Sequence, residues 1–174
     1  MIFIIVLATL SLDQLIKFLI TKNLFQNQSI PIIKGIFHIT LVHNRGAAFG
    51  ILKNQIPLFI ITSLFAIILI YFNLKKIAFG DNLKVRFLSG FRKVLYTFLH
   101  HKENRQSKSY SIALSLILAG ALGNLVDRLF FGYVIDFLDF RIWPVFNVAD
   151  SAITVGAILL GWLILFKKNV SRNL

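Results

Sequence analysis

Acidic and amide side chains in the second half of the sequence have the types and spacing that could activate water. Asn124 and Asp127 stand three residues apart, Asn147 and Asp150 repeat that spacing, and Asp136 lies between the two pairs. Residues three apart in a helix share a face, so each pair would present an amide and a carboxylate together. Two such faces at one level would make a polar pocket.

Two carboxylates held close together suit hydrolysis without a metal or a nucleophilic side chain. Since like charges in contact cannot both ionise, the pair shares a proton, and one acid can accept a proton from water while the other donates to a carbonyl oxygen. Other chemistries fit less well. The sequence has no cysteine and no G-x-S-x-G motif, and its four histidines, His38, His43, His100 and His101, do not cluster with the acids. We therefore expect no metal and no cofactor.

Each of these residues also has a purely structural interpretation. Asn147 would cap a helix, and Asp150 would favour the positive end of its dipole. Arg128 would extend toward the membrane interface, and Asp139 would face water. The clustering of acids, amides and an arginine on one side of a bilayer favours chemistry.

The elements that must position these side chains are membrane-spanning helices. The chain has 174 residues, of which 57% are hydrophobic and 15% charged, and a span needs about 20 mainly apolar residues. Four segments qualify: residues 2–20, 57–74, 109–126 and 148–166. The sequence predicts an all-α membrane protein, a single integral membrane domain over residues 1–174, with a small extracytoplasmic β-sheet between the first and second helices.

The distribution of basic residues orients the four spans. The connection 75–108 holds nine Lys and Arg and the tail after residue 166 holds three, against six in the two connections on the other side. The positive-inside rule then places both termini and the basic loop 75–108 in the cytoplasm. A net charge of +12 distributed this way reflects topology, and we expect no nucleic acid partner.

The connections between the spans differ in character. Residues 29–50 form the outer β region, with strands expected at 30–33 and 36–43 around a Lys34-Gly35 turn. The second outer connection, 127–147, carries Tyr133 and Trp143 and should lie at the membrane interface. In loop 75–108 the recurrence of Phe87, Phe91, Leu95 and Phe98 is typical of an amphipathic helix on the inner leaflet, although a disordered basic loop is the alternative.

Asp13 and Lys17 lie inside the first span, where charged side chains are costly. They are four residues apart in the favourable acid-first order, so we expect them to pair. Such a pair would either fix helix packing alone or support a site beside it.

Four sequence blocks, in this order, resemble the signature blocks of the lipoprotein signal peptidases (signal peptidase II). They are Asp13-Gln14-x-x-Lys17; Asn44-Arg45-Gly46-Ala47-Ala48-Phe49-Gly50; Gly123-Asn124-x-x-Asp127-Arg128 followed by Val134-x-Asp136-Phe137; and Phe146-Asn147-x-Ala149-Asp150. Any single block is weak evidence, but four blocks spread over the chain are specific.

The resemblance implies a multi-pass enzyme of the bacterial cytoplasmic (inner) membrane with its active site on the extracytoplasmic side. Its substrates would be diacylglyceryl-modified prolipoproteins, cut just before the lipidated cysteine, and membrane lipid would be its other partner. Asp136 and Asp150 take the catalytic positions. The substrate-binding or supporting positions fall on Asn44, Gly46, Asn124, Asp127, Arg128, Asn147, Ala149, Asp13 and Lys17.

Two other classes of protein are alternatives to a protease: a small proton-coupled transporter or channel, and a non-enzymatic assembly or lipid-binding protein. A proton-coupled transporter would spread its acids across the depth of the bilayer and would show an inverted repeat. A non-enzymatic assembly or lipid-binding protein would need no clustered acids. Here most acids collect on one side and no repeat is visible.

Overall fold

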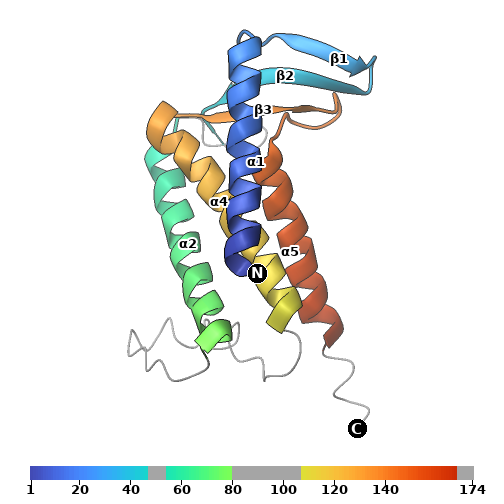
Figure 1. Ribbon diagram of the computed structural model, residues 1–174. Coiled ribbons are helices and arrows are strands. Elements are labelled where there is room, and N and C mark those ends of the chain that lie inside the picture. The colour runs from blue at the N-terminus through green and yellow to red at the C-terminus, as the bar shows by residue number, and fades with distance from the viewer. Residues whose placement is uncertain (47–53, 80–106, 168–174) are drawn as a thin grey trace.

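Four long apolar helices form the body of the molecule (Figure 1). The computed structural model describes residues 1–46, 54–79 and 107–167. The helices are α1 (Ile2–Asn23), α2 (Ile56–Phe79), α4 (Ser107–Phe131) and α5 (Val148–Lys167). All four contain a stretch long and apolar enough to cross a membrane, which confirms the four predicted spans.

Each helix extends beyond its predicted span, most clearly at the ends of α4 and α2. The third helix continues to Phe131, five residues past its predicted end at residue 126, and α2 runs to Phe79, into the segment predicted as loop 75–108. Both spans were delimited by hydropathy, whereas a helix can continue through polar residues such as Asp127 and Arg128 when these find partners. The predicted amphipathic helix around Phe87 to Phe98 lies outside the described residues.

Helix α4 is central to the bundle and packs against α1, α2 and α5. Its contact with α5 is especially close. A Cβ at Gly120 would overlap the carbonyl oxygen of Ala149, and one at Gly123 would lie 2.7 Å from Oδ2 of Asp13. Small residues at helix crossings let backbones approach closely in membranes. The glycines therefore bring α1 and the beginning of α5 against one turn of α4.

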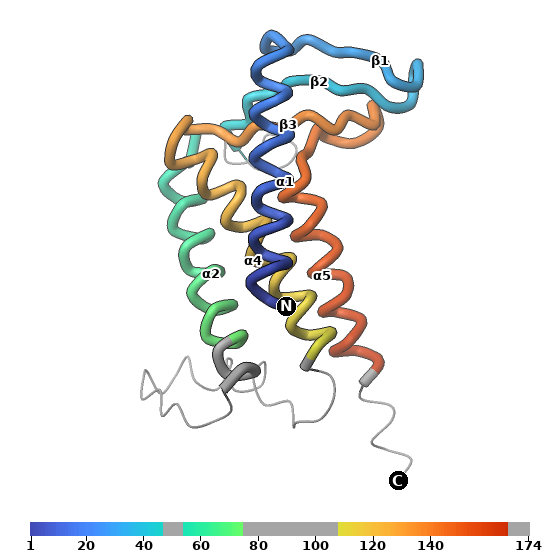
Figure 2. The backbone as a smooth tube through the Cα atoms, viewed as in Figure 1, coloured from blue at the N-terminus to red at the C-terminus, as the bar shows by residue number. Residues whose placement is uncertain are grey.

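A three-stranded antiparallel sheet covers the end of the bundle where α1 ends and α5 begins (Figure 2). Its strands are β1 (Ser29–Ile33), β2 (Phe37–Asn44) and β3 (Val134–Asp139), in that order. The first two were predicted. The third was not: it comes from the connection between α4 and α5, so the sheet does not belong to the first connection alone. Pairing of Val42 with Asp136 and of Asn44 with Val134 joins the two connections.

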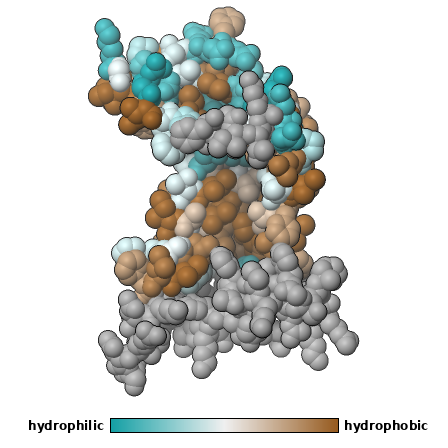
Figure 3. Space-filling view, turned by 180° about the vertical axis from the view of Figure 1, so that it is seen from behind, coloured by the Kyte–Doolittle hydropathy of each residue, from teal (hydrophilic) through white to brown (hydrophobic). Residues whose placement is uncertain are grey.

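Most large side chains on the helices point outward. Phe3 is 74% exposed and Leu165 70%, while Asp13, Lys17 and Asp127 are at most 1% exposed. Seen from the side opposite α1, the body below the hydrophilic sheet end is apolar and hollowed (Figure 3). Apolar side chains outside and charged groups inside are what a bilayer as solvent requires.

Candidate active site

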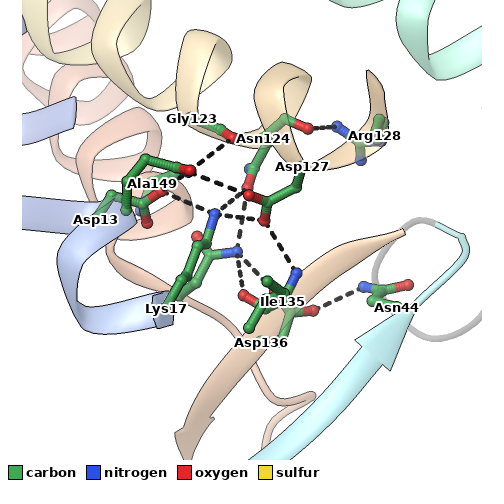
Figure 4. Close-up of polar contacts among 12 residues, drawn as sticks. Asp13, Lys17, Asn44, Gly123, Asn124, Asp127, Arg128, Ile135, Asp136 and Ala149 are labelled. Carbon is green, nitrogen blue, oxygen red and sulfur yellow. Dashed lines mark hydrogen bonds and ion pairs between the residues drawn. The ribbon is translucent and has the colours of Figure 1, made fainter. Parts of the chain in front are cut away.

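Lys17 lies at the centre of a buried charge cluster between α1 and α4 (Figure 4). Its Nζ is 2.8 Å from Oδ2 of Asp13, one turn earlier in α1, and 2.8 Å from Oδ2 of Asp127 on α4. It also donates to Oδ1 of Asn124 at 3.3 Å. The predicted pair of Asp13 and Lys17 is confirmed, and Asp127 shares the cation. Three acceptors satisfy the three N–H donors of the ammonium group.

Asn124 and Asn147 link this cluster to two further acids. Nδ2 of Asn147 donates to Oδ1 of Asn124 at 3.1 Å and to Oδ1 of Asp136 at 2.7 Å. Nδ2 of Asn124 donates to Oδ1 of Asp150 at 2.7 Å. Asn147 also caps α5, because its Oδ1 accepts the backbone N–H of Asp150 at 2.8 Å. The capping interpretation is therefore correct, and the same side chain belongs to the site as well.

Asp136 projects from β3 into a buried position between β2 and α5. Nδ2 of Asn44 donates to its Oδ2 at 2.9 Å, and Asn147 holds its other oxygen. Burial, followed by the negative charge of Asp150, raises the pKa of Asp136 to about 7, against the lowering effects of the two amide hydrogen bonds and of Lys17. Near neutral pH this carboxyl group is therefore protonated in a large fraction of molecules.

Asp150 lies in the first turn of α5, where the helix dipole favours a negative charge. Arg128 stands nearby on α4: its Nη1 donates to the carbonyl oxygen of Asn124 at 3.4 Å, and its guanidinium lies 5.0 Å from the ring centre of Phe59. The positive charge of Arg128 interacts with the carboxylates of Asp150, Asp136 and Asp127. It is thus half-buried against an aromatic ring and near enough to the acids for their charges to interact, rather than extended to the interface alone.

Asp139, the remaining aspartate between residues 127 and 150, belongs to a different network at the far end of β3. Thr40 donates to its Oδ2 at 2.8 Å, and Arg141 pairs with the same oxygen at 3.0 Å. Burial acts to raise the pKa of Asp139, but these hydrogen bonds and the Arg141 charge outweigh burial and lower it. The alternative interpretation, that Asp139 merely faces water, is wrong, since the residue is 5% exposed. The backbone N–H of Arg141 also donates to its Oδ1 at 2.8 Å, so Asp139 braces the turn after β3.

The structure gathers the residues that the sequence singled out, with one difference in arrangement. The two amide and acid pairs do meet, through Asn124 and Asn147, but Asp127 turns away from the acids of the site toward Lys17. The two small residues among the predicted supporting positions, Ala149 and Gly46, contribute backbone N–H groups. That of Ala149 donates to Oδ1 of Asp13 at 2.8 Å, and that of Gly46 donates to Oδ1 of Asn44 at 2.9 Å. Gly46 is the last described residue before the gap at 47–53.

Gln14 received no role from the sequence. Its Nε2 contacts Oδ2 of Asp13 at 3.1 Å, Oδ1 of Asp127 at 3.1 Å and the carbonyl oxygen of Gly123 at 3.3 Å. It neighbours Asp13 in the first block, and its position beside the helical face of Asp13 and Lys17 was the signal that could have identified it.

The arrangement holds two carboxyl groups in different environments. In the described parts of the chain, 1–46, 54–79 and 107–167, no group of three His, Cys, Asp or Glu side chains is placed to hold a metal ion. Asp136 and Asp150 come from a strand and a helix, interact electrostatically, and are each fixed by an amide donor. Such a pair can both accept and donate a proton.

Fold and site together define a membrane-embedded enzyme whose acids lie at one end of a four-helix bundle. The family model described as signal peptidase (SPase) II matches residues 5–91 and 75–166. The lipoprotein signal peptidase of Halothermothrix orenii is 42% identical over 160 residues, which cover 92% of each chain. That of Moorella thermoacetica is 44% identical over 160 residues, covering 91% of this chain and 89% of the relative.

A solved structure of a bacterial membrane enzyme, determined by the in meso method at 2.3 Å resolution, has the same fold with a TM-score of 0.72. It is 29% identical, and the match covers 98% of this chain and 90% of that one. The chain belongs to the signal peptidase II family of aspartic peptidases.

Proposed function

We propose that this peptidase removes signal peptides from prolipoproteins that carry a diacylglyceryl group on a cysteine, and that it cuts the peptide bond just before that cysteine. The curated relatives are named lipoprotein signal peptidases, which supports lipoprotein precursors as substrates. The signal peptide and the acyl chains of such a substrate are apolar, and they suit the apolar, hollowed face of the bundle below the sheet (Figure 3).

The observation that carries this proposal is the arrangement of Asp136 and Asp150. They come from separate elements and interact electrostatically, and burial together with that interaction raises the pKa of Asp136 to about 7. In the proposed reaction, ionised Asp150 takes a proton from a water molecule as the water oxygen attacks the scissile carbonyl carbon. Protonated Asp136 donates its proton to the carbonyl oxygen. Return of protons to the leaving nitrogen and collapse of the tetrahedral intermediate release both products.

The other residues of the site would bind or brace rather than react. Asn124 and Asn147 orient the two acids through their amide N–H groups. Arg128 supplies positive charge near both, and Asn44 with Gly46 lies at the end of β2 beside Asp136, where an extended substrate segment could run along the sheet.

The site would face the outside of a bacterial cytoplasmic membrane. Basic residues concentrate in segment 75–108 and the tail, which favours a cytoplasmic location for the end of the bundle where α1 begins and α5 ends. Asp136 belongs to β3 and Asp150 to the first turn of α5, and both elements lie at the opposite end of the bundle (Figure 1). Both termini would then be cytoplasmic, surrounding membrane lipid would be the other partner, and no nucleic acid partner is proposed.

The test is cleavage of a purified diacylglyceryl-modified preprotein by single-residue variants, with binding of the same substrate measured separately. We expect Asp136→Asn and Asp150→Asn each to abolish cleavage while binding persists, because an amide preserves shape but cannot exchange a proton. The double variant should be scarcely worse, since the members of one catalytic unit are not additive. Asp139→Asn is the control and should retain most activity. Robust cleavage by either single variant would overturn the assignment.

A further inference from the structure

Two backbone N–H groups in the site have the same kind of partner. The N–H of Ala149 donates to Oδ1 of Asp13 at 2.8 Å, and the N–H of Ile135 donates to Oδ2 of Asp127 at 3.0 Å. Each donor residue comes directly before one of the two aspartates proposed to be catalytic. The two accepting carboxylates are joined by Lys17, which lies 2.8 Å from each. One buried cation thus connects the backbone of β3 to the beginning of α5.

The third contact of Lys17, with Asn124, also reaches Asp150, one of the two aspartates proposed to be catalytic. The donation of Lys17 to Oδ1 of Asn124 leaves Nδ2 of that amide to donate to Asp150. If the amide were turned over, its N–H groups would face the ammonium group and its oxygen would face the carboxylate. Both contacts would be repulsive. Lys17 therefore fixes which end of Asn124 meets Asp150.

Joining two helices does not require this much buried charge. Lys17 already has an acid in its own helix, Asp13, so the addition of Asp127 leaves a cluster of two carboxylates and one ammonium, all at most 1% exposed. Excess buried charge costs free energy. The second carboxylate offers two oxygens that only accept, which a neutral amide does not: Oδ2 accepts the ammonium N–H and the backbone N–H of Ile135, and Oδ1 accepts from Nε2 of Gln14.

Resting on the catalytic roles proposed above, we propose that Asp13, Lys17 and Asp127 form a positioning unit, here called the ion triad, that sets the relative placement of the two catalytic aspartates. Asp13 holds the backbone before Asp150, and Asp127 holds the backbone before Asp136. Lys17 fixes the distance between the two holding carboxylates. None of the three reacts with substrate.

The main test is the charge-free variant Asp13→Asn/Lys17→Met/Asp127→Asn, which leaves no unpaired ion in the triad. Because a misplacement of about 1 Å can cost about 100-fold in rate, we expect kcat to fall about 10- to 100-fold. KM for a diacylglyceryl-modified preprotein should stay within about threefold of wild type. A role in packing alone would leave kcat of the folded fraction unchanged, so the division between kcat and KM separates the two interpretations.

Two single variants keep the test decisive if the triple variant does not accumulate. Asp13→Asn and Asp127→Asn each leave one complete ion pair with Lys17. Each also replaces an accepting oxygen by an amide nitrogen that cannot accept, so at least one of the N–H groups that the carboxylate holds, from Lys17, Gln14 or the backbone, loses its acceptor. Each should lower kcat at nearly constant KM. The matched control is Ser115→Ala, which removes another fully buried hydrogen bond of α4, from Oγ to the carbonyl oxygen of Ser111, and should leave kcat unchanged.

Asp136→Asn is assayed in parallel to separate the two proposals. If Asp136→Asn is inactive and the folded triad variants cleave with wild-type kcat, the ion triad has no positioning role while the proposed function stands. If Asp136→Asn cleaves, the catalytic assignment fails and the triad proposal fails with it. Reduced kcat in the triad variants, with an inactive Asp136→Asn and a normal Ser115→Ala, supports both.

Discussion

Replacement of Asp136 by asparagine should make the folded protein more stable at neutral and alkaline pH, although it abolishes cleavage. The pKa of Asp136 rises from 3.8 to about 7 on folding, so the folded state holds this proton more tightly than the unfolded state. The folded protein therefore loses stability as pH rises from about 4 to about 7, and the loss is constant above that range. About three pKa units correspond to about 4 kcal/mol.

Asparagine at position 136 does not ionise, so the variant is free of this loss of stability at high pH. The substitution also changes the hydrogen bonds that Asp136 accepts from Asn44 and Asn147. The Nδ2 of the new asparagine cannot accept from Asn44 or Asn147, and a lost hydrogen bond costs about 1 kcal/mol. We expect the free energy of unfolding of Asp136→Asn to exceed that of wild type by about 3 kcal/mol at pH 8, and to match it near pH 4.5. Unfolding by sodium dodecyl sulfate in mixed micelles at several pH values measures the difference.

Asp139→Asn is the matched control for this measurement, because its shift has the opposite sign. The pKa of Asp139 is lowered on folding, so its ionised form contributes stability above its ordinary pKa, and that contribution is lost as pH falls through the lowered value. Asp139→Asn should therefore be less stable than wild type at pH 8. An Asp136→Asn variant that is equally or less stable at pH 8, or whose difference does not vary with pH, would refute the reasoning.

Three further predictions follow from the same structure. Cleavage should decline as pH rises through about 7, because the proton donor Asp136 ionises; a kcat profile that stays flat to pH 9 would contradict its role. Reporters fused after Lys102 and after Leu174 should read cytoplasmic, and one near His38 should read external. An external reading after Lys102 would contradict the proposed location of the active site on the extracytoplasmic side. Gly120→Val should push α5 from α4, since even a Cβ there overlaps Ala149. The expected destabilisation is about 1–3 kcal/mol with loss of cleavage, and thermal unfolding of the purified variant checks it.

The spans and the acids of the site could be read from the sequence because their signals are local. Hydropathy over about 20 residues identifies a span, and the four-residue spacing of Asp13 and Lys17 predicts the pair that the structure contains. The spacing of Asn124 and Asp127 likewise placed both on one helix. It could not show that Asp127 turns to Lys17, because that choice depends on a helix more than a hundred residues away.

The third strand could not be read in the same way. Val134 to Asp139 is buried on both faces, so the segment lacks the alternation of apolar and polar residues that identifies a half-buried strand. Its partner, β2, lies about ninety residues earlier, and the register that pairs Val42 with Asp136 is a property of the assembled sheet. Similarly, the contacts of Gln14 depend on the approach of α4 permitted by Gly123.

The ion pair inside α1 bears on how the chain enters the bilayer during synthesis. α1 is made first, and α4, which carries Asp127, follows about ninety residues later. Since Asp13 and Lys17 stand one turn apart in the favourable order, the first helix brings its own counter-ion and enters lipid without an isolated charge. Lys17 gains Asp127 as a second partner, beside Asp13, only when α4 arrives, and β2 gains its second neighbour only when β3 follows. The nascent chain is therefore inserted early but becomes a peptidase late, after its last two helices are in place.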